Sequence, residues 1–360
     1  MIYILFFSTL ILGAGLIRQK KPTAYLLFIT AFLFIIIGFR SIEVGTDTES
    51  YVRFFKNVRT LSFHQIWWVM SEKEPVYTFL TWLIGQYSSS QTFYLCFWAL
   101  FPCVALYYTF RDELSTSTDY LIAYLCFFGL GLYAFFVAGI RQTAAMSLVL
   151  LSYQSFKHLN ISLKIKDYWN FDALKVIIYL LIAYNIHNSV LLFIPILFFM
   201  KLKIRWWYIV VAVGLCFISS FIKIDVIVNI ALMFFGDRFD AYGVTYESSQ
   251  SIYTFLIQLI LFIICFIQKD KLCTENRTNT YLFNIVMAGL LFQSLSGLLY
   301  EMARVSFYFS IFFLILVPRA IKAYPTEFKM PMYWSFGIAF LVYLFFLSES
   351  SLPEYSSAII

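Results

Sequence analysis

Residues 91–110 read QTFYLCFWALFPCVALYYTF, a stretch that contains no charged residue. An α-helix needs about 20 apolar residues to cross the hydrocarbon core of a bilayer, so this stretch is long enough to span it. Other apolar runs of spanning or near-spanning length lie at residues 2–17, 23–39, 120–139, 142–156, 206–222, 251–267, 280–298, 304–318 and 331–347. The sequence therefore predicts an all-α, polytopic integral membrane protein with about ten transmembrane helices in one domain, residues 1–360.

The composition excludes several classes of protein. The chain is 61% apolar and 13% charged. The first run lacks a preceding basic segment and a small-residue cleavage site, so we expect it to be a retained helix and not a signal peptide. Five of the six cysteines lie in apolar runs, and no CxxC pair or Cys/His cluster occurs, which argues against a zinc site or a disulfide framework. The net charge of +6 is what the positive-inside rule produces in a membrane protein, so nucleic acid is not implied.

The distribution of lysine and arginine predicts the orientation. With the basic loops placed in the cytoplasm, 17 of these residues lie inside and nine outside, and both termini lie outside. Both termini lie on the same side only if the number of crossings is even, which requires that residues 75–87 do not cross the membrane. Since 13 residues of helix span only about 20 Å, we expect this segment to lie in the outer leaflet, within an outer-face loop of amphipathic helices at residues 40–90.

A second irregular segment lies at residues 175–200. Lys175 and Lys201 are both expected in the cytoplasm, and the chain between them is too short for two crossings. We therefore predict a re-entrant hairpin with His187 near its tip. Non-helical backbone is tolerated in a bilayer only inside protein or against a watery cavity, which implies a cavity open to the outer face.

The sequence offers no nucleotide-binding domain. The longest predicted cytoplasmic loop, residues 157–175, is too short to form a domain, and no Walker A or GxGxxG pattern is present. An activated donor must therefore carry its own energy and be reached from the membrane or the outer face. No cofactor is expected.

Four arginines on the outer side stand out. They lie at predicted helix mouths or in a charged loop, at Arg40, Arg141, Arg238 and Arg304. Each one alone could be a side chain that reaches to the interface. Four of them on the side opposite the basic loops favour a bound diphosphate, because planar guanidinium groups match phosphate oxygens in pairs.

Two carboxylates accompany the arginines. Asp47 in VGTDTESY and Glu74 before Pro75 could each be a helix-capping or first-turn acid, and either could instead be a general base. Together the two could also hold a divalent ion. Tyr51 and Tyr77 could stack on sugars or belong to an interfacial aromatic belt. His187 could be a structural histidine or could orient a phosphate or a hydroxyl.

Taken in order, these motifs closely resemble those of the EpsG family, the Wzy-type polymerases of bacterial surface polysaccharide. The set comprises Arg40, Gly45-Thr46-Asp47-Thr48 with Tyr51, Glu74-Pro75-Val76-Tyr77, Ile140-Arg141-Gln142 with Ala145, and His187-Asn188-Ser189. Arg238 with Tyr242 and Arg304 with Tyr308 fit the same pattern. The resemblance implies Asp47, Glu74 and His187 as catalytic residues, with Asp47 favoured as the general base, Glu74 second, and His187 positioning the donor or the acceptor. It also implies substrate binding by Arg40, Tyr51, Tyr77, Arg141, Gln142, Arg238 and Arg304, with no metal.

The resemblance also implies a function. A family member would transfer a growing glycan from undecaprenyl diphosphate to the non-reducing end of a lipid-linked repeat unit, at the outer face of the bacterial inner membrane. The product would be an exopolysaccharide, a capsule or an O-antigen. The expected partners are the lipid-linked repeat units, the bilayer and a chain-length-regulating co-polymerase, with no nucleic acid. The alternatives are a transporter or flippase of lipid-linked oligosaccharide, and a lipid-linked glycan ligase.

Overall fold

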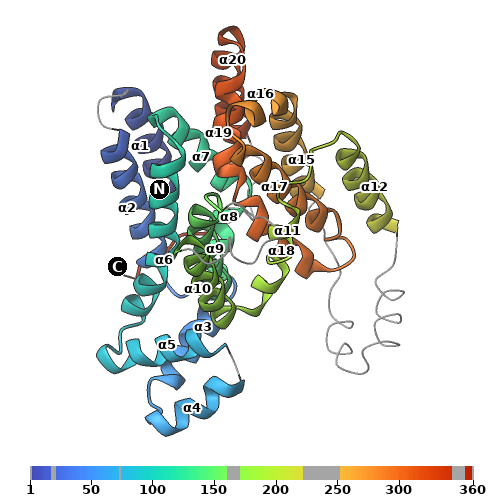
Figure 1. Ribbon diagram of the computed structural model, residues 1–360. Helices are drawn as coiled ribbons and strands as arrows, with labels where there is room; N and C mark the ends of the chain where they lie inside the picture. The colour runs from blue at the N-terminus through green and yellow to red at the C-terminus, as the bar shows by residue number, and fades with distance from the viewer. Residues whose placement is uncertain are drawn as a thin grey trace. The chain divides into compact units, whose positions relative to one another are not determined.

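The computed structural model describes residues 2–17, 22–72, 74–159, 171–221, 252–342 and 353–358. In these ranges every regular element is a helix, and the remaining pairing is one isolated antiparallel bridge (Figure 1). The chain divides into two compact units, residues 1–191 with 325–360, and residues 192–324. The predicted all-α class is confirmed, and the many apolar helices are consistent with a membrane protein.

Each unit contains several helices. The first unit holds α1 (Ile2–Ile17), α2 (Pro22–Gly38), α3 (Thr48–Val58), α4 (Phe63–Glu72), α5 (Pro75–Tyr87), α6 (Gln91–Glu113), α7 (Ser117–Gly129), α8 (Leu132–Ala138), α9 (Ile140–Phe156), α10 (Phe171–Ile186) and α20 (Thr326–Val342). The second unit holds α11 (Ile196–Phe199), α12 (Trp207–Phe221), α15 (Ile252–Ile267), α16 (Lys269–Glu275), α17 (Thr278–Ser294), α18 (Tyr300–Ser310) and α19 (Phe313–Ala323).

The long apolar helices set a lower bound on the number of crossings. Among the described residues, α6 is by itself long and apolar enough to span a bilayer, and counting each bent helix pair as one span brings the total to four. Shorter apolar helices include α2 and α12. The expected ten crossings and their orientation stay predictions.

Bends interrupt two of the apolar runs that we expected to be continuous. The run at 120–139 divides into α7 and α8, which meet at 63°. Gly131 lies between them with a φ of 72°, and its N–H donates to the carbonyl of Phe128, which is how a helix commonly ends. The run at 304–318 divides into α18 and α19, bent by 50°. Each of these two runs is therefore divided by a bend, and a single crossing by each helix pair stays a prediction.

The core of the first unit is a layer of neighbouring helices. Helix α2 packs on α6, α6 packs on α9, and α9 packs on α10, while α1 lies against α2 and α7 (Figure 1). Buried hydroxyl groups join these helices. Tyr25 donates to the carbonyl of Leu10 at 2.5 Å, and the hydroxyl groups of Thr30 and Tyr124 lie 2.7 Å apart. These two bonds give buried hydroxyl groups of α2 partners on α1 and α7, which offsets the cost of burying them.

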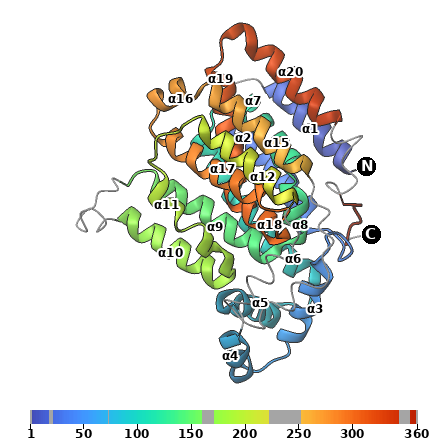
Figure 2. The same cartoon turned by 90° about the vertical axis from the view of Figure 1, so that its right-hand side faces the viewer.

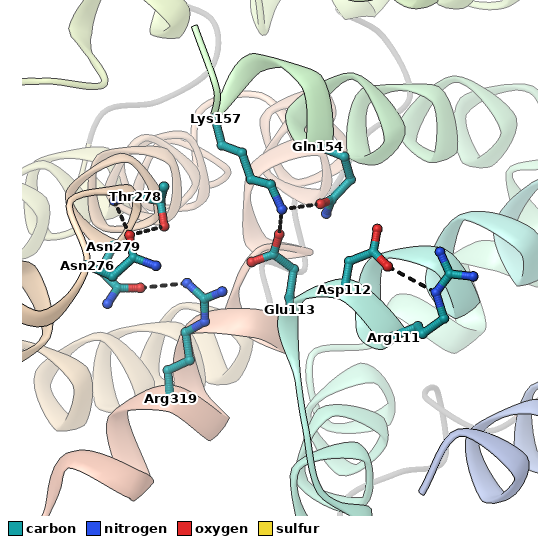
Figure 3. Close-up of polar contacts among 9 residues, drawn as sticks. All are labelled: Arg111, Asp112, Glu113, Gln154, Lys157, Asn276, Thr278, Asn279 and Arg319. Carbon is teal, nitrogen blue, oxygen red and sulfur yellow. Dashed lines mark hydrogen bonds and ion pairs between the residues drawn. The ribbon is translucent and has the colours of Figure 1, made fainter. Parts of the chain in front are cut away.

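An ion pair joins the carboxyl ends of α6 and α9. Lys157 Nζ donates to Glu113 Oε1 at 2.5 Å and to Gln154 Oε1 at 2.6 Å (Figure 3). The Glu113 side chain is only 2% exposed, so this is a buried pair and removal of either partner leaves an uncompensated charge. The pair lies at the opposite end of α9 from Arg141, about 24 Å away along the helix.

A lobe of three short helices, α3, α4 and α5, gathers at one end of the first unit (Figures 1 and 2). Val52, Phe55 and Val58 form the buried face of α3, at the three-residue spacing expected of an amphipathic helix. The bounds of α5, Pro75–Tyr87, are those predicted for the short segment at 75–87. Its predicted place in the outer leaflet stays a prediction.

The lobe is attached to the core at Gly45. The chain there has a φ of 94°, and an added Cβ would lie 2.6 Å from the carbonyl oxygen of Val137. The same carbonyl accepts a hydrogen bond of 3.0 Å from Thr48 Oγ1 at the start of α3. Glycine is therefore required at 45 both for its backbone conformation and for this close approach.

We expect Gly45→Ala to destabilise the protein by about 3 kcal/mol, since left-handed backbone strain and a steric overlap add. Gly131→Ala is the matched control, because Gly131 also has a positive φ but no atom within 4 Å of the added Cβ. This control should cost only about 1 kcal/mol. Thermal unfolding of the two variants in the same detergent measures the difference. Equal losses would contradict the close approach at Val137.

The last described residues pair with the segment after α2. The N–H of Ser41 donates to the carbonyl of Ser356 at 2.8 Å, and that of Ala358 donates to Phe39 at 2.9 Å. Tyr3 donates to the carbonyl of Pro353 at 2.8 Å. The first unit is thus built from both ends of the chain.

In the second unit, side-chain amides and hydroxyls connect the helices. Asn284 donates to the carbonyls of Met200 and Leu202, both at 2.9 Å, and Ser219 donates to the carbonyl of Ser294 at 2.7 Å. These bonds hold α17 against the segment before α12 and against α12 itself.

Candidate active site

Glu74 lies in the short connection between α4 and α5. Pro75 is the first residue of α5 and suits that position because its ring presets the backbone for a helix. The side chain of Glu74 makes no capping bond with its own helix and is 9% exposed. Its two oxygens instead meet side chains from two other elements. The carboxylate of Glu74 is therefore not a helix cap of α5.

The first partner of Glu74 is Arg141, the second residue of α9. Arg141 Nη1 donates to Glu74 Oε2 at 2.6 Å. Its guanidinium carbon also lies 5.5 Å from the ring centre of Tyr51 and 5.7 Å from that of Tyr77. Guanidinium groups are attracted to aromatic faces at this range. With 35% of its side chain exposed, Arg141 is held by fixed neighbours and is still open to a ligand.

The second partner is His187, directly after the end of α10. The break after Ile186 places its ring beside the lobe, with Nδ1 2.5 Å from Glu74 Oε1. A carboxylate accepts hydrogen bonds, so Nδ1 carries the proton. In a neutral imidazole Nε2 is then a proton acceptor, and 24% of the side chain is exposed. This is the orientation that a histidine needs to act as a general base.

The surroundings of Glu74 keep it ionised. Burial tends to raise its pKa, but the hydrogen bond from His187 and the positive charge of Arg141 more than offset this. The pKa is consequently lowered from its ordinary value of 4.5. The carboxylate thus holds both partners at neutral pH.

This lowered pKa predicts a pH dependence of stability. The contribution of ionised Glu74 is complete above the pKa of the unfolded chain, near 4.5, and is lost as the pH falls through the lower folded value. The difference in unfolding temperature between the wild type and Glu74→Gln should therefore shrink as the pH is lowered from about 6 toward about 3, because this range contains the unfolded pKa near 4.5 and extends below it. Thermal scans in detergent measure it. A difference that stays constant over this range would contradict the lowered pKa.

Tyr77 is a buried residue that packs beside the guanidinium of Arg141. Its ring is 3% exposed, lies 5.7 Å from that of Phe54 and 5.0 Å from that of Trp98, and its hydroxyl lies 2.8 Å from that of Tyr94. A ring so enclosed has no face for a sugar. Tyr51 is only partly buried, so of the two predicted stacking residues it is the one that is accessible.

Asp47 is the residue directly before α3, the helix that carries Tyr51. It precedes the helix, and its carbonyl accepts from the N–H of Tyr51 one turn later at 3.1 Å. Residues four apart lie on the same face of a helix, so Asp47 and Tyr51 share one face. The Asp47 side chain makes no capping bond to α3. Asp47 is thus placed one helical turn from Tyr51, whose ring lies beside Arg141.

Two predicted ligands are buried. Arg40 is 1% exposed and donates to the carbonyls of Ile37 at 2.5 Å and Val137 at 2.9 Å. It satisfies carbonyls at the ends of α2 and α8, a common task of arginine at helix ends. Gln142 is 5% exposed, on α9. Neither side chain presents a surface to a substrate in this structure.

The other two arginines are not part of this cluster as described. Arg304 lies on α18 in the second unit, with Nη1 3.9 Å from Glu301 one turn earlier. Arg238 lies outside the described residues. Their predicted roles in phosphate binding stay predictions.

The pairing of Glu74 with His187 was not predicted, although both residues were named. They are 113 positions apart, and nothing in either local motif indicates the other. Tyr94, the hydroxyl partner of Tyr77, was also missed. The described residues hold no group of three His, Cys, Asp or Glu side chains placed to bind a metal.

Fold and site together define a helical protein with apolar helices typical of membranes, in which one end of a helical layer carries a cluster of Glu74, His187 and Arg141. A family model, that of the EpsG family, matches residues 23–357, and the chain belongs to this family. Membership supports a function of the polysaccharide polymerase type, with glycosyltransferase-like chemistry. No curated protein and no solved structure matches the chain.

Proposed function

We propose that this protein polymerises a bacterial surface polysaccharide by transferring the growing glycan from undecaprenyl diphosphate to a lipid-linked repeat unit, at the outer face of the inner membrane. Family membership supports the general class. The observation that carries the reaction is the 2.5 Å contact between His187 Nδ1 and Glu74 Oε1, beside a partly exposed Arg141.

His187 is the proposed general base. A hydroxyl of the acceptor sugar attacks the anomeric carbon of the donor while His187 Nε2 takes the hydroxyl proton. The bond from the anomeric carbon to the diphosphate oxygen breaks, and undecaprenyl diphosphate leaves with both electrons of that bond. Water later removes the proton from His187. Glu74 fixes the tautomer and stabilises the imidazolium, a task for which its lowered pKa suits it.

Arg141 is the proposed diphosphate ligand. Negative charge on the leaving group grows in the transition state, so a fixed cation beside it lowers the barrier more than it stabilises the bound substrate. Glu74, Tyr51 and Tyr77 hold the guanidinium in place, which avoids reorganisation during the reaction.

Asp47 is proposed to contact the acceptor sugar. Its place one turn before Tyr51 supports this, since a partly exposed aromatic ring and a carboxylate on one helix face suit a sugar. The geometry favours His187 over Asp47 as the base, because the oriented His187–Glu74 pair is the one seen. An active Asp47→Asn variant together with an inactive His187→Ala variant would support this assignment.

The test is reconstitution of the purified chain in liposomes with defined lipid-linked repeat units, in EDTA. We expect a ladder of lipid-linked glycans from the wild type and none from His187→Ala. His64→Ala is the matched control, because His64 is exposed on α4 and contacts only Trp68 among the rings described. Movement of intact lipid-linked units without a ladder would make the protein a transporter. Transfer only to a different lipid acceptor would make it a ligase.

A further inference from the structure

The second unit contains a polar cavity where the ends of three helices meet. The cavity has a volume of about 270 Å³ and lies between α16, the start of α17 and the end of α19. Ligand sites commonly begin near this size, at about 300 Å³. The polar side chains that line it are Glu275, Asn276, Asn279, Arg319 and Lys322. It belongs to none of the elements that form the Glu74 cluster.

Arg319 is held in this cavity by a buried amide. Arg319 Nη1 donates to Asn279 Oδ1 at 2.7 Å (Figure 3). Asn279 is 3% exposed and is itself fixed, because its Nδ2 donates to the carbonyl of Leu272 at 2.8 Å. This bond orients the guanidinium through a neutral group. Such an arrangement is suited to an anion.

The cavity also lies directly beyond the end of an apolar helix, in a segment of the chain that is rich in basic residues. The apolar helix α15 ends at Ile267, and α16 turns away from it by 65°. Lys269 lies over the ring of Phe266 at 4.5 Å, and Lys271 donates to the carbonyl of Ala323 at 2.7 Å. The segments 269–279 and 319–323 carry five basic residues against two acidic ones. A basic excess directly beyond an apolar helix is expected at the level of lipid headgroups.

We propose that this cavity binds the phosphate of an anionic phospholipid. Arg319 and Lys322 would contact the phosphate oxygens, and the apolar Leu272 and Ala323 in the lining would face the glycerol. Basic pockets between membrane helices are known to take such headgroups. The bound lipid would join the ends of α16, α17 and α19. This inference does not depend on the proposed polymerase reaction.

The test is lipid binding by the full chain purified in a neutral detergent. Phosphatidylglycerol is added in steps, bound lipid is counted by native mass spectrometry, and thermal unfolding is followed in parallel. We expect one retained lipid and a rise of several degrees in the unfolding temperature with phosphatidylglycerol but not with phosphatidylcholine. Inorganic phosphate is the second probe, and we expect it to give no comparable rise.

Lys322→Gln and Arg319→Gln should lower phosphatidylglycerol affinity by about tenfold each, in line with the loss of one charge-assisted hydrogen bond. Lys203→Gln is the matched control, since Lys203 is an exposed lysine of the same unit and does not line the cavity. The phosphatidylglycerol affinity of this variant should equal that of the wild type. If Arg319→Gln does not fold, the partly exposed Lys322 still provides the test. Equal affinity in all three variants, or equal protection by inorganic phosphate, would overturn the proposal.

Discussion

Arg141→Ala is expected to lower the rate of glycan polymerisation by about 100-fold, the usual loss when one fixed charge donor is removed from a developing anion. Arg141→Lys should recover only part of this rate. Lysine keeps the charge but lacks the planar group that bonds Glu74 and lies against Tyr51 and Tyr77. Initial rates with defined lipid-linked repeat units measure both variants.

The matched control is Arg53→Ala. Arg53 is on α3 in the same lobe and pairs with Glu49 one turn away, but both side chains are mostly exposed. An exposed pair of this kind contributes little, so the rate should stay near that of the wild type. A normal rate from a folded Arg141→Ala protein would show that Arg141 does not stabilise the leaving group.

The second large effect concerns Glu74 and His187 as a pair. We expect His187→Ala to lower the rate by about 10² to 10⁴, the range for a lost general base. Glu74→Gln should cause a loss of similar size, because an amide can hold the wrong tautomer of the imidazole. The double variant should be little worse than His187→Ala alone, since the two residues act as a unit.

Four proteins measured under one set of conditions complete this cycle. Losses that simply multiply in the double variant would show that Glu74 and His187 act independently. That result would exclude the assigned tautomer role of Glu74 and would return Asp47 to consideration as the base.

Local sequence features predicted the position and ends of one key helix and the identity of several site residues. The bounds of α5 follow from Pro75 at its start and the short apolar run behind it, both of which are local signals. Arg141, Glu74 and His187 could be named because charged or titratable groups are rare in such an apolar chain. Their meeting could not be predicted, because it depends on how α5, α9 and α10 pack.

Two features that the sequence did not predict also have physical causes. Hydropathy does not reveal a bend, so the break at Gly131 between α7 and α8 was invisible in the run at 120–139. Arg40 looked like a ligand because it ends an apolar helix. The carbonyl of Val137 that it bonds lies almost a hundred residues away in the chain, and only the folded structure brings the two together.

The pairing of residues 39–41 with residues 356–358 has a consequence for biosynthesis. The first unit needs residues from 325 onward, whereas the second is one continuous segment, residues 192–324. A ribosome adds about 5–20 residues each second, so the early helices wait some tens of seconds, roughly 15 to 60, for their last partners. During that interval Phe39 and Ser41 have their backbone groups unpaired with the tail, and a chaperone or insertase that shields nascent helices would act at this stage.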